Sequence, residues 1–147
     1  MKIFLSVPFT SRALPDDTLD PDYERQMRFV IRSLTEAGHT VFCALEHANW
    51  TFGGLTPPEE ELQKDLQEIE LCDKLIAYLE ERVSSGVQLE LGYAYAKGKR
   101  IEVYQEGKAS WSNAAFVKLS GNTATAITGI DDFVQKAIAN NSPAVHS

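Results

Sequence analysis

Residues 74–104 read KLIAYLEERVSSGVQLELGYAYAKGKRIEVY, with two short apolar runs on either side of a longer, largely apolar segment. The runs Lys74–Leu79 and Arg100–Tyr104 have the length and composition of strands buried on both faces. Between them we predict a helix that is capped by one hydroxyl of the pair Ser84-Ser85 and runs to Lys97, where a glycine follows. The stretch therefore predicts two parallel strands joined by a crossover helix.

The same alternation extends over the rest of the chain. Strands are predicted at Lys2–Val7, Thr40–Leu45 and Thr123–Thr128, and helices at Asp22–Ala37, 57–71, Trp111–Ser120 and Ile130–Ala139. This order predicts a three-layer α/β fold in which helices cover both faces of a five-stranded parallel sheet. We expect one domain over residues 1–140 and a frayed tail over 141–147. Ligands of such folds bind beyond the carboxyl ends of the strands, so the loops after the first three strands are of most interest.

The charge and hydropathy of the chain limit its partners. The sequence has 147 residues and a formal net charge of −7. A nucleic-acid polymer requires a basic footprint, so we expect no such partner, whereas a single nucleotide needs only a local site. No apolar run approaches the length of a membrane span, and residues 1–7 read as a first strand rather than a signal peptide. We therefore expect no membrane partner.

Cys43 and Cys72 are the only cysteines, and their spacing fits neither a disulfide framework nor a zinc site. Both lie in apolar surroundings, so we interpret them as buried free thiols of a protein in a reducing compartment, the cytoplasm. No other metal-ligand spacing is present. We expect neither a metal nor a cofactor.

Glu90 is the first candidate for chemistry, because it lies in a helix that is otherwise largely apolar. The helix begins with Ser84, Ser85 and Gly86, where backbone amides and the helix dipole favour an anion. Gly86 lies four residues before Glu90, on the same face, and would let a ligand approach its carboxyl group. Glu90 lies about 7 Å along the axis from Ser85, comparable to the span from a 5′-phosphate to an anomeric carbon. Alternatively, Ser85 and Gln88 form a capping box and Glu90 is a solvated acid.

Two further candidates follow the second predicted strand and the helix after it. Asp65 borders the inward apolar stripe of its helix, although it could instead cap or pair locally. His47 is an acid/base candidate or a donor to a base, with a plain loop histidine as the alternative. Trp50 and Phe52 could stack on a nucleobase or merely close the edge of the core.

The loop after the first strand is rich in hydrogen-bond donors. Ser6, Thr10 and Ser11 supply hydroxyl groups, and Arg12 can hold a phosphate. The glycine-rich pattern of a P-loop is absent. The loop therefore predicts contacts to a polar ligand without specifying one.

The segment 86–94, GVQLELGYA, resembles the signature of the nucleoside 2-deoxyribosyltransferase superfamily. That superfamily includes 2′-deoxynucleoside 5′-phosphate N-hydrolases and the cytidylate N-hydrolases of nucleoside-antibiotic pathways. The similarity extends from the first strand to the segment 111–120. It implies a flavodoxin-like, Rossmann-like sheet, a homo-oligomer (a dimer or higher) and a glutamate nucleophile, which Glu90 matches.

Other positions match the family one by one. Asp65 matches its conserved acid, and Glu46-His47 looks like the Glu-His that follows the second strand of the hydrolases. Ser84 matches a phosphate-binding serine six residues before the nucleophile. Asn113 lies near the position where a neighbouring subunit reaches into the site.

The departures from the family also carry information. Phe4 stands where many members have a tyrosine that orients the nucleophile or senses the sugar. The stretches Pro8-Phe9-Thr10 and Asn49-Trp50 look like the cytidylate-hydrolase branch, which makes Phe9 a substrate-binding candidate. Residues 141–147 offer nothing like the aromatic tail of the transferases.

The residues and the resemblance together predict hydrolysis of the N-glycosidic bond of a (deoxy)nucleoside 5′-monophosphate. We expect Glu90 to stay ionised and stabilise or capture an oxocarbenium-like centre, with Asp65 or His47 assisting the leaving base. One alternative is a 2-deoxyribosyltransferase, and another is a nucleotide-binding module without turnover. A flavin or response-regulator domain is disfavoured, because no phosphoacceptor aspartate ends the first or third predicted strand.

Overall fold

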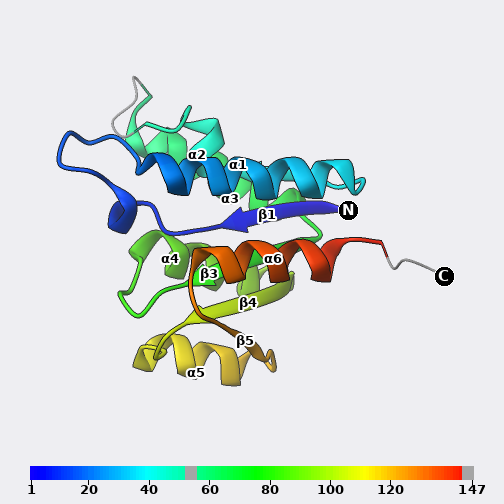
Figure 1. Cartoon of the computed structure of the whole chain (residues 1–147). Helices are drawn as coiled ribbons and strands as arrows, with labels where there is room; N and C mark the ends of the chain where they lie inside the picture. Colours follow the sequence, from blue (N-terminus) through cyan, green and yellow to red (C-terminus); the bar gives the residue numbers. More distant parts are fainter. Residues whose placement is uncertain (52–55, 144–147) are drawn as a thin grey trace.

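A five-stranded parallel sheet forms the middle of the molecule, as Figure 1 shows in a computed structural model that describes residues 1–51 and 56–143. Its strands are β1 (Lys2–Ser6), β2 (Thr40–Cys43), β3 (Lys74–Leu79), β4 (Arg100–Glu106) and β5 (Ala124–Ile127). Their order across the sheet is β2-β1-β3-β4-β5, and every neighbouring pair is parallel. All strands therefore end at the same edge, where the loops that could form a site come together.

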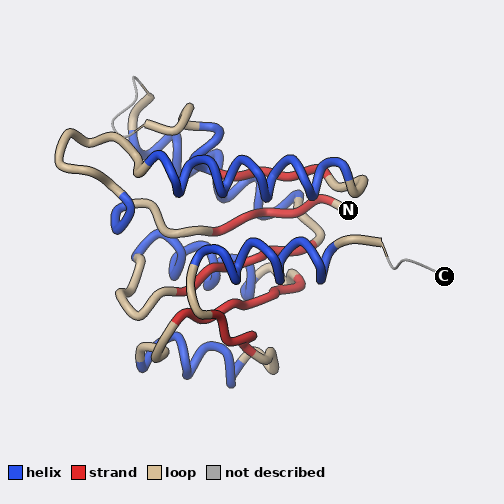
Figure 2. Tube along the Cα trace, in the orientation of Figure 1, coloured by secondary structure: helices blue, strands red, loops and turns tan. Residues whose placement is uncertain are grey.

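Helices cover both faces of this sheet (Figure 2). One face carries α1 (Pro21–Glu36) and α6 (Ile130–Asn141), and the other carries α3 (Pro58–Leu71), α4 (Ser85–Ala96) and α5 (Trp111–Leu119). Two short helices, η1 (Thr10–Arg12) and α2 (Ala44–His47), follow β1 and β2. The predicted three-layer α/β fold is confirmed.

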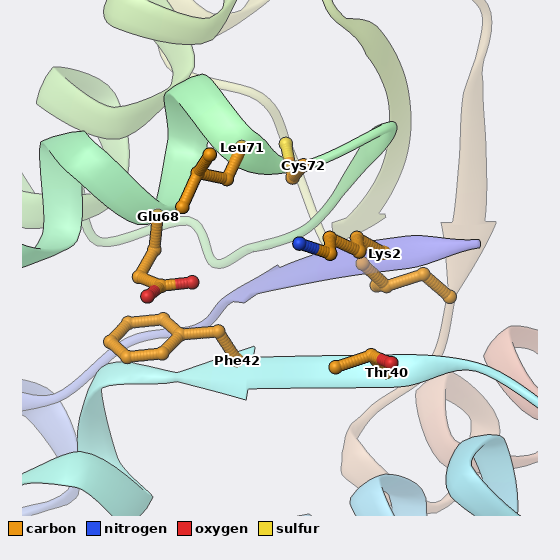
Figure 3. A pocket seen from close by; sticks show the side chains of 7 residues that line it. Lys2, Thr40, Phe42, Glu68, Leu71 and Cys72 are labelled. Atoms are coloured by element: carbon orange, nitrogen blue, oxygen red, sulfur yellow. The ribbon is translucent and has the colours of Figure 1, made fainter.

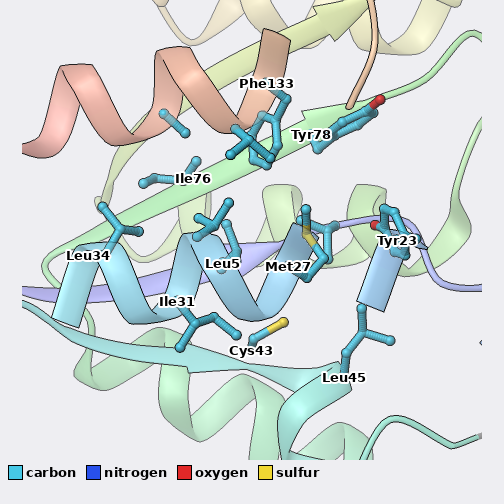
Figure 4. Packing of buried hydrophobic residues seen from close by; sticks show 14 of the residues in the cluster. Leu5, Tyr23, Met27, Ile31, Leu34, Cys43, Leu45, Ile76, Tyr78 and Phe133 are labelled. Atoms are coloured by element: carbon cyan, nitrogen blue, oxygen red, sulfur yellow. The ribbon is translucent and has the colours of Figure 1, made fainter. Parts of the chain in front are cut away.

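The alternation of side chains along β1 explains why there are two cores. Ile3 and Leu5 point into the core under α1 and α6, whereas Phe4 points into the core under α3 and α4. Figure 4 shows the first of these cores, in which side chains of α1 interlock with those of the strands and with Phe133 of α6. A strand buried on both faces must be apolar at successive positions, and this accounts for the continuous apolar runs of the sequence.

The second strand is shorter than expected. It ends at Cys43, and α2 begins at once with Ala44, so Glu46 and His47 lie on a short helix rather than in a loop. The chain therefore turns away from the sheet two residues before the predicted strand end at Leu45. Leu45 is part of α2 and its side chain remains buried in the core.

The last helix is longer than expected. It runs to Asn141 rather than Ala139, and the side chain of Asn141 is buried. Its Nδ2 donates to Oε2 of Glu102 on β4 over 2.8 Å, which ties the helix end to the sheet. Residue 141 thus belongs to a helix and not to a frayed tail, and residues 144–147 lie outside the described residues.

Two further expectations concern the cysteines and membrane spans. Cys43 and Cys72 are both free and buried, as predicted. Over residues 1–51 and 56–143, no helix is both long enough and apolar enough to span a bilayer.

Candidate active site

A cavity of about 1000 Å³ opens at the carboxyl ends of β1, β2 and β3. Its walls come from the loops after these three strands, from α3 and from the first turns of α4. These are the loops in which parallel sheets place their ligands. The cavity brings together Glu90, Asp65 and His47, which the sequence suggested separately.

Glu90 lies on α4, lines the cavity and is only 9% exposed. Ser6, at the end of β1, donates a hydrogen bond from its Oγ to Oε1 of Glu90 over 2.7 Å. Burial raises the pKa of Glu90 to about 8; the Ser6 hydrogen bond offsets part of this rise, and the charge of Asp65 adds to it. Burial and the charge of Asp65 therefore oppose the expected ionised state of Glu90, whereas the Ser6 hydrogen bond favours it.

Asp65 faces the same cavity from α3. Its pKa is raised to about 6, mainly by burial and then by the charge of Glu61, while His47 opposes the rise. Oδ1 of Asp65 is buried and has no hydrogen-bond partner among the described residues. His47 lies close to both acids of α3, Glu61 and Asp65, and its Nε2 is 3.9 Å from Oε2 of Glu61. This wall thus offers one unsatisfied acceptor and an imidazole to a ligand.

The first turn of α4 forms the part of the wall nearest the loop after β3. Ser84 is the N-cap, and its Oγ accepts a hydrogen bond from the backbone N–H of Val87 over 3.4 Å. Ser84, Ser85 and Gly86 all line the cavity, and a Cβ on Gly86 would meet no atom within 4 Å. Gly86 therefore leaves space open one helical turn before Glu90.

Gln88 rules out the capping-box interpretation. Its Nε2 donates to Oγ of Ser112 over 2.7 Å and to Oδ1 of Asn113 over 3.0 Å, so the side chain points toward α5 and not back to the N-cap. Asn113 itself is 3% exposed and does not line the cavity. Within one chain, Asn113 joins α5 to α4.

The loop after β1 contributes Phe9, Thr10 and Ser11 to the wall but directs Arg12 elsewhere. Nη2 of Arg12 donates to Oε2 of Glu80 over 2.8 Å and to the hydroxyl oxygen of Tyr78 over 3.3 Å. Ser11 donates to the other oxygen of Glu80 over 2.5 Å. The guanidinium predicted to hold a phosphate is thus already paired with a carboxylate of its own chain.

Trp50 is 5% exposed and lies in the core rather than in the cavity wall. Asn49 and Trp50 both adopt left-handed backbone conformations, with φ of 56° and 61°, immediately after α2. This conformation is unusual for a bulky residue, and it turns the indole inward. The guanidinium carbon of Arg28 lies 4.5 Å from the centre of the Trp50 ring. Asn49, in contrast, lines the cavity. Phe52 lies outside the described residues.

Three charged residues of the cavity wall are not among the sequence candidates: Glu61, Glu80 and Arg82. Glu61 lies one helical turn before Asp65, so the same spacing argument would have placed it on that face. Glu80 and Arg82 directly follow β3, in a loop already singled out. Among the described residues, no group of three or more His, Cys, Asp or Glu side chains is arranged to hold a metal ion.

A second, much smaller hollow of about 120 Å³ lies near the start of β1 (Figure 3). Lys2, Glu68 and Cys72 are among its lining residues. Burial raises the pKa of the Cys72 thiol, which keeps it protonated and a poor nucleophile. This hollow therefore does not compete with the cavity around Glu90 as a catalytic site.

The family model named nucleoside 2-deoxyribosyltransferase matches residues 16–128. The chain belongs to this family. It is therefore a member of a family of enzymes that handle glycosyl groups of nucleosides, as the resemblance implied. No curated protein matches the sequence significantly.

Solved structures with the same fold include members named for two related activities. The CMP N-glycosidase BcmB of Clostridium botulinum has a TM-score of 0.69 at 20% identity, over 95% of this chain and 99% of that chain. A 2-deoxyribosyltransferase of Bacillus psychrosaccharolyticus has a TM-score of 0.63 at 20% identity, over 97% and 96%. BlsM has a TM-score of 0.68 at 20% identity, over 99% and 97%. At this identity the three structures share the fold with this chain.

Proposed function

We propose that this protein hydrolyses the N-glycosidic bond of a nucleoside 5′-monophosphate and releases the free base and a sugar 5-phosphate. One observation carries the proposal: a single cavity joins the buried Glu90, the unsatisfied Asp65 and the N-terminal turn of α4. The sugar lies over Glu90, the base lies toward Asp65 and His47, and the 5′-phosphate lies at Ser84, Ser85 and Gly86.

Glu90 acts first, as the nucleophile. Ser6 occupies Oε1, so Oε2 is the oxygen that attacks the anomeric carbon as the bond to the base breaks. The base leaves with the electron pair of that bond and receives a proton from the Asp65 carboxyl group. His47 contacts the base and helps to orient it. The product of this step is a glycosyl ester on Glu90 and a neutral free base.

Water completes the cycle. It attacks the anomeric carbon of the ester, the carboxylate of Glu90 leaves, and Asp65, now ionised, accepts the water proton. The two carboxyl groups thus return to their starting state. No metal or redox group takes part in either step.

The pKa values of these two groups fit this cycle. With values of about 6 for Asp65 and about 8 for Glu90, the pair holds one proton between these two pH values. The chemistry requires one carboxylate and one carboxylic acid, which is the same proton count. The active arrangement has the proton on Asp65, and a cationic centre forming above Glu90 favours it.

A base-exchanging 2-deoxyribosyltransferase is the second candidate, because the matching family model carries that name. In that reaction a second base, instead of water, attacks the glycosyl ester. Arg12 is paired with Glu80 and Trp50 lies in the core, so neither residue favours water or a second base as the attacking group. Competition between water and an added base is therefore the deciding measurement.

We also propose that a second copy of the chain covers an apolar surface on α4 and α5. Leu89 and Tyr95 of α4 and Trp111 and Leu119 of α5 are large apolar side chains between 46% and 86% exposed. Large exposed apolar side chains on neighbouring helices are candidates for a contact site between proteins. The expected state is a homodimer or higher oligomer, and the two buried free thiols fit a reducing compartment such as the cytoplasm.

A chromatographic screen tests the function. Ribo- and deoxyribonucleoside 5′-monophosphates and their nucleosides are incubated with the protein, with and without an acceptor base. We expect release of base from at least one monophosphate, and a loss of about 1,000-fold or more in Glu90→Gln. Full activity of that variant would remove Glu90 as the nucleophile. Exchange that outpaces release would establish the transferase.

A further inference from the structure

The wall of the cavity is rich in carboxyl groups. Glu61, Asp65, Glu80 and Glu90 all line it. Among the described lining residues, Arg82 carries the only permanent positive charge. A phosphate dianion near several carboxylates is repelled, and this repulsion is strong where water is partly excluded. A 5′-phosphate therefore needs a cation in this wall, and Arg82 is the available one.

The acids next to Arg82 in the sequence are already engaged. Ser11 and Arg12 hold both oxygens of Glu80, at 2.5 and 2.8 Å. Oε1 of Glu81 accepts a hydrogen bond from the backbone N–H of Lys108 over 2.7 Å. These contacts direct Glu80 toward the loop after β1 and Glu81 toward the loop after β4. Neither carboxylate neutralises Arg82.

Arg82 itself is exposed and makes no hydrogen bond or ion pair with any described residue. It precedes Ser84, the N-cap of α4, by two residues. The first turn of this twelve-residue helix presents backbone amides and the positive end of its dipole to the same part of the cavity. The long side chain of an unpaired arginine at this position can reach an anion held at Ser84–Gly86.

We propose that Arg82 pairs with the 5′-phosphate and makes the enzyme prefer nucleotides to nucleosides. This inference rests on the proposed function and adds a specificity-determining residue to it. Two parallel N–H groups of the guanidinium bind two phosphate oxygens. Arg12 acts indirectly, because it neutralises Glu80 and so leaves Arg82 free for the ligand.

The test compares Arg82→Gln and Arg82→Lys on a nucleoside 5′-monophosphate and on the nucleoside with the same base and sugar. We expect Arg82→Gln to lower kcat/KM for the nucleotide by about 10- to 100-fold, mainly through KM, and to change the nucleoside value less than about twofold. Arg82→Lys keeps the positive charge but cannot form two parallel hydrogen bonds to a phosphate. Its kcat/KM for the nucleotide should therefore lie between those of wild type and Arg82→Gln. Arg100→Gln is the matched control, because Arg100 is an exposed arginine at the opposite end of the sheet.

Two outcomes overturn the inference: an unchanged kcat/KM of Arg82→Gln for the nucleotide, and an equal loss on nucleotide and nucleoside. Binding of ribose 5-phosphate, measured by calorimetry, tests it separately from turnover. Wild type should bind this probe at least about tenfold more tightly than Arg82→Gln, whether or not any nucleotide is hydrolysed. Equal binding would reject Arg82 as the phosphate ligand. Absence of hydrolysis with the binding difference intact would reject only the proposed reaction.

Discussion

Two glutamates line the same cavity and are held in opposite ways. Glu80, just after β3, receives hydrogen bonds from Ser11 and Arg12, and the Arg12 guanidinium provides a compensating charge 2.8 Å away. Glu90, on α4, receives a single hydroxyl hydrogen bond from Ser6 and has no cationic partner among the described residues. Glu80 is therefore paired with a cation, whereas Glu90 is buried without one and its pKa is raised.

This difference is the one expected between a structural acid and the nucleophile proposed for this site. A carboxylate with a guanidinium partner gains little by reacting, because its charge is already satisfied. A desolvated carboxylate with one hydrogen bond is a better nucleophile and benefits when a cationic centre forms above it. The contrast gives opposite expectations for the stability of the two amide variants.

The largest expected effect is on stability. Burial raises the pKa of Glu90 from 4.5 unfolded to about 8 folded, so the folded state binds the extra proton and the free energy of unfolding falls as pH rises between these values. Glu90→Gln removes this dependence. Its stability relative to wild type should therefore grow by about 1.4 kcal/mol for each pH unit from 5 to 8. Urea unfolding at several pH values measures this.

Glu80→Gln should act in the opposite direction. It leaves the largely buried Arg12 without its closest partner, and we expect a loss of about 2 kcal/mol at pH 7 with folding retained. Its activity should fall by less than about tenfold. A stabilised Glu80→Gln protein, or a Glu90→Gln protein whose stability advantage is the same at pH 5 and pH 8, would contradict the contrast.

The pH dependence of turnover is the next largest effect. We expect kcat/KM to be nearly flat between about pH 6 and 8, where the pair Asp65 and Glu90 holds one proton. Above this range it should fall about tenfold per pH unit, because both groups are then ionised and no acid remains. The 5′-phosphate of a substrate is already fully ionised above about pH 8. The decline of kcat/KM in that range, the alkaline limb of the pH profile, therefore reports on groups of the protein.

Asp65→Asn tests the assignment of that alkaline limb. In this variant the activity, although lower, should rise with pH and stay level above the pKa of Glu90. That pKa should lie below about 8, because the charge of Asp65 no longer raises it. An alkaline decline that persists unchanged in Asp65→Asn would show that another group supplies the proton.

The smallest effect compares two glycines of the Glu90 helix. A Cβ would meet no atom within 4 Å at either Gly86 or Gly92, but only Gly86 lines the cavity. Alanine at either position should therefore stabilise the helix by about 0.5–1 kcal/mol. Gly86→Ala should also raise KM severalfold, whereas Gly92→Ala should not. Thermal unfolding and steady-state kinetics on both variants measure this, and equal KM values would show that no ligand passes close to Gly86.

Much of this arrangement could be predicted from the sequence, because it depends on local patterns. The apolar runs Lys2–Val7 and Lys74–Leu79 gave strands, and the serine pair before Gly86 gave the start of α4 within one residue. Parallel strands then place the loops of the site at one edge. Glu90 stood out because an acid is unusual in such an apolar helix.

Other features depend on contacts between residues that are distant in the sequence. The pairing of Arg12 with Glu80 joins positions 68 residues apart, so a sequence pattern could not show that this guanidinium is occupied. Trp50 turns inward through two consecutive left-handed residues, a conformation that neither asparagine nor tryptophan requires. The pKa of Glu90 depends on how fully the cavity is desolvated, and that is a property of the folded chain.

The hydrogen bond from Ser6 to Glu90 also has a consequence for how the protein is made. It joins residues 84 positions apart, and β1 is paired on both sides, by β2 and by the later β3. Closing a loop of this length costs entropy that only the assembled sheet repays, so the contact forms late in folding. A nascent chain that has not yet released α4 from the ribosome lacks the proposed nucleophile. The proposed hydrolase activity should therefore appear abruptly, together with the cooperative folding of the whole sheet.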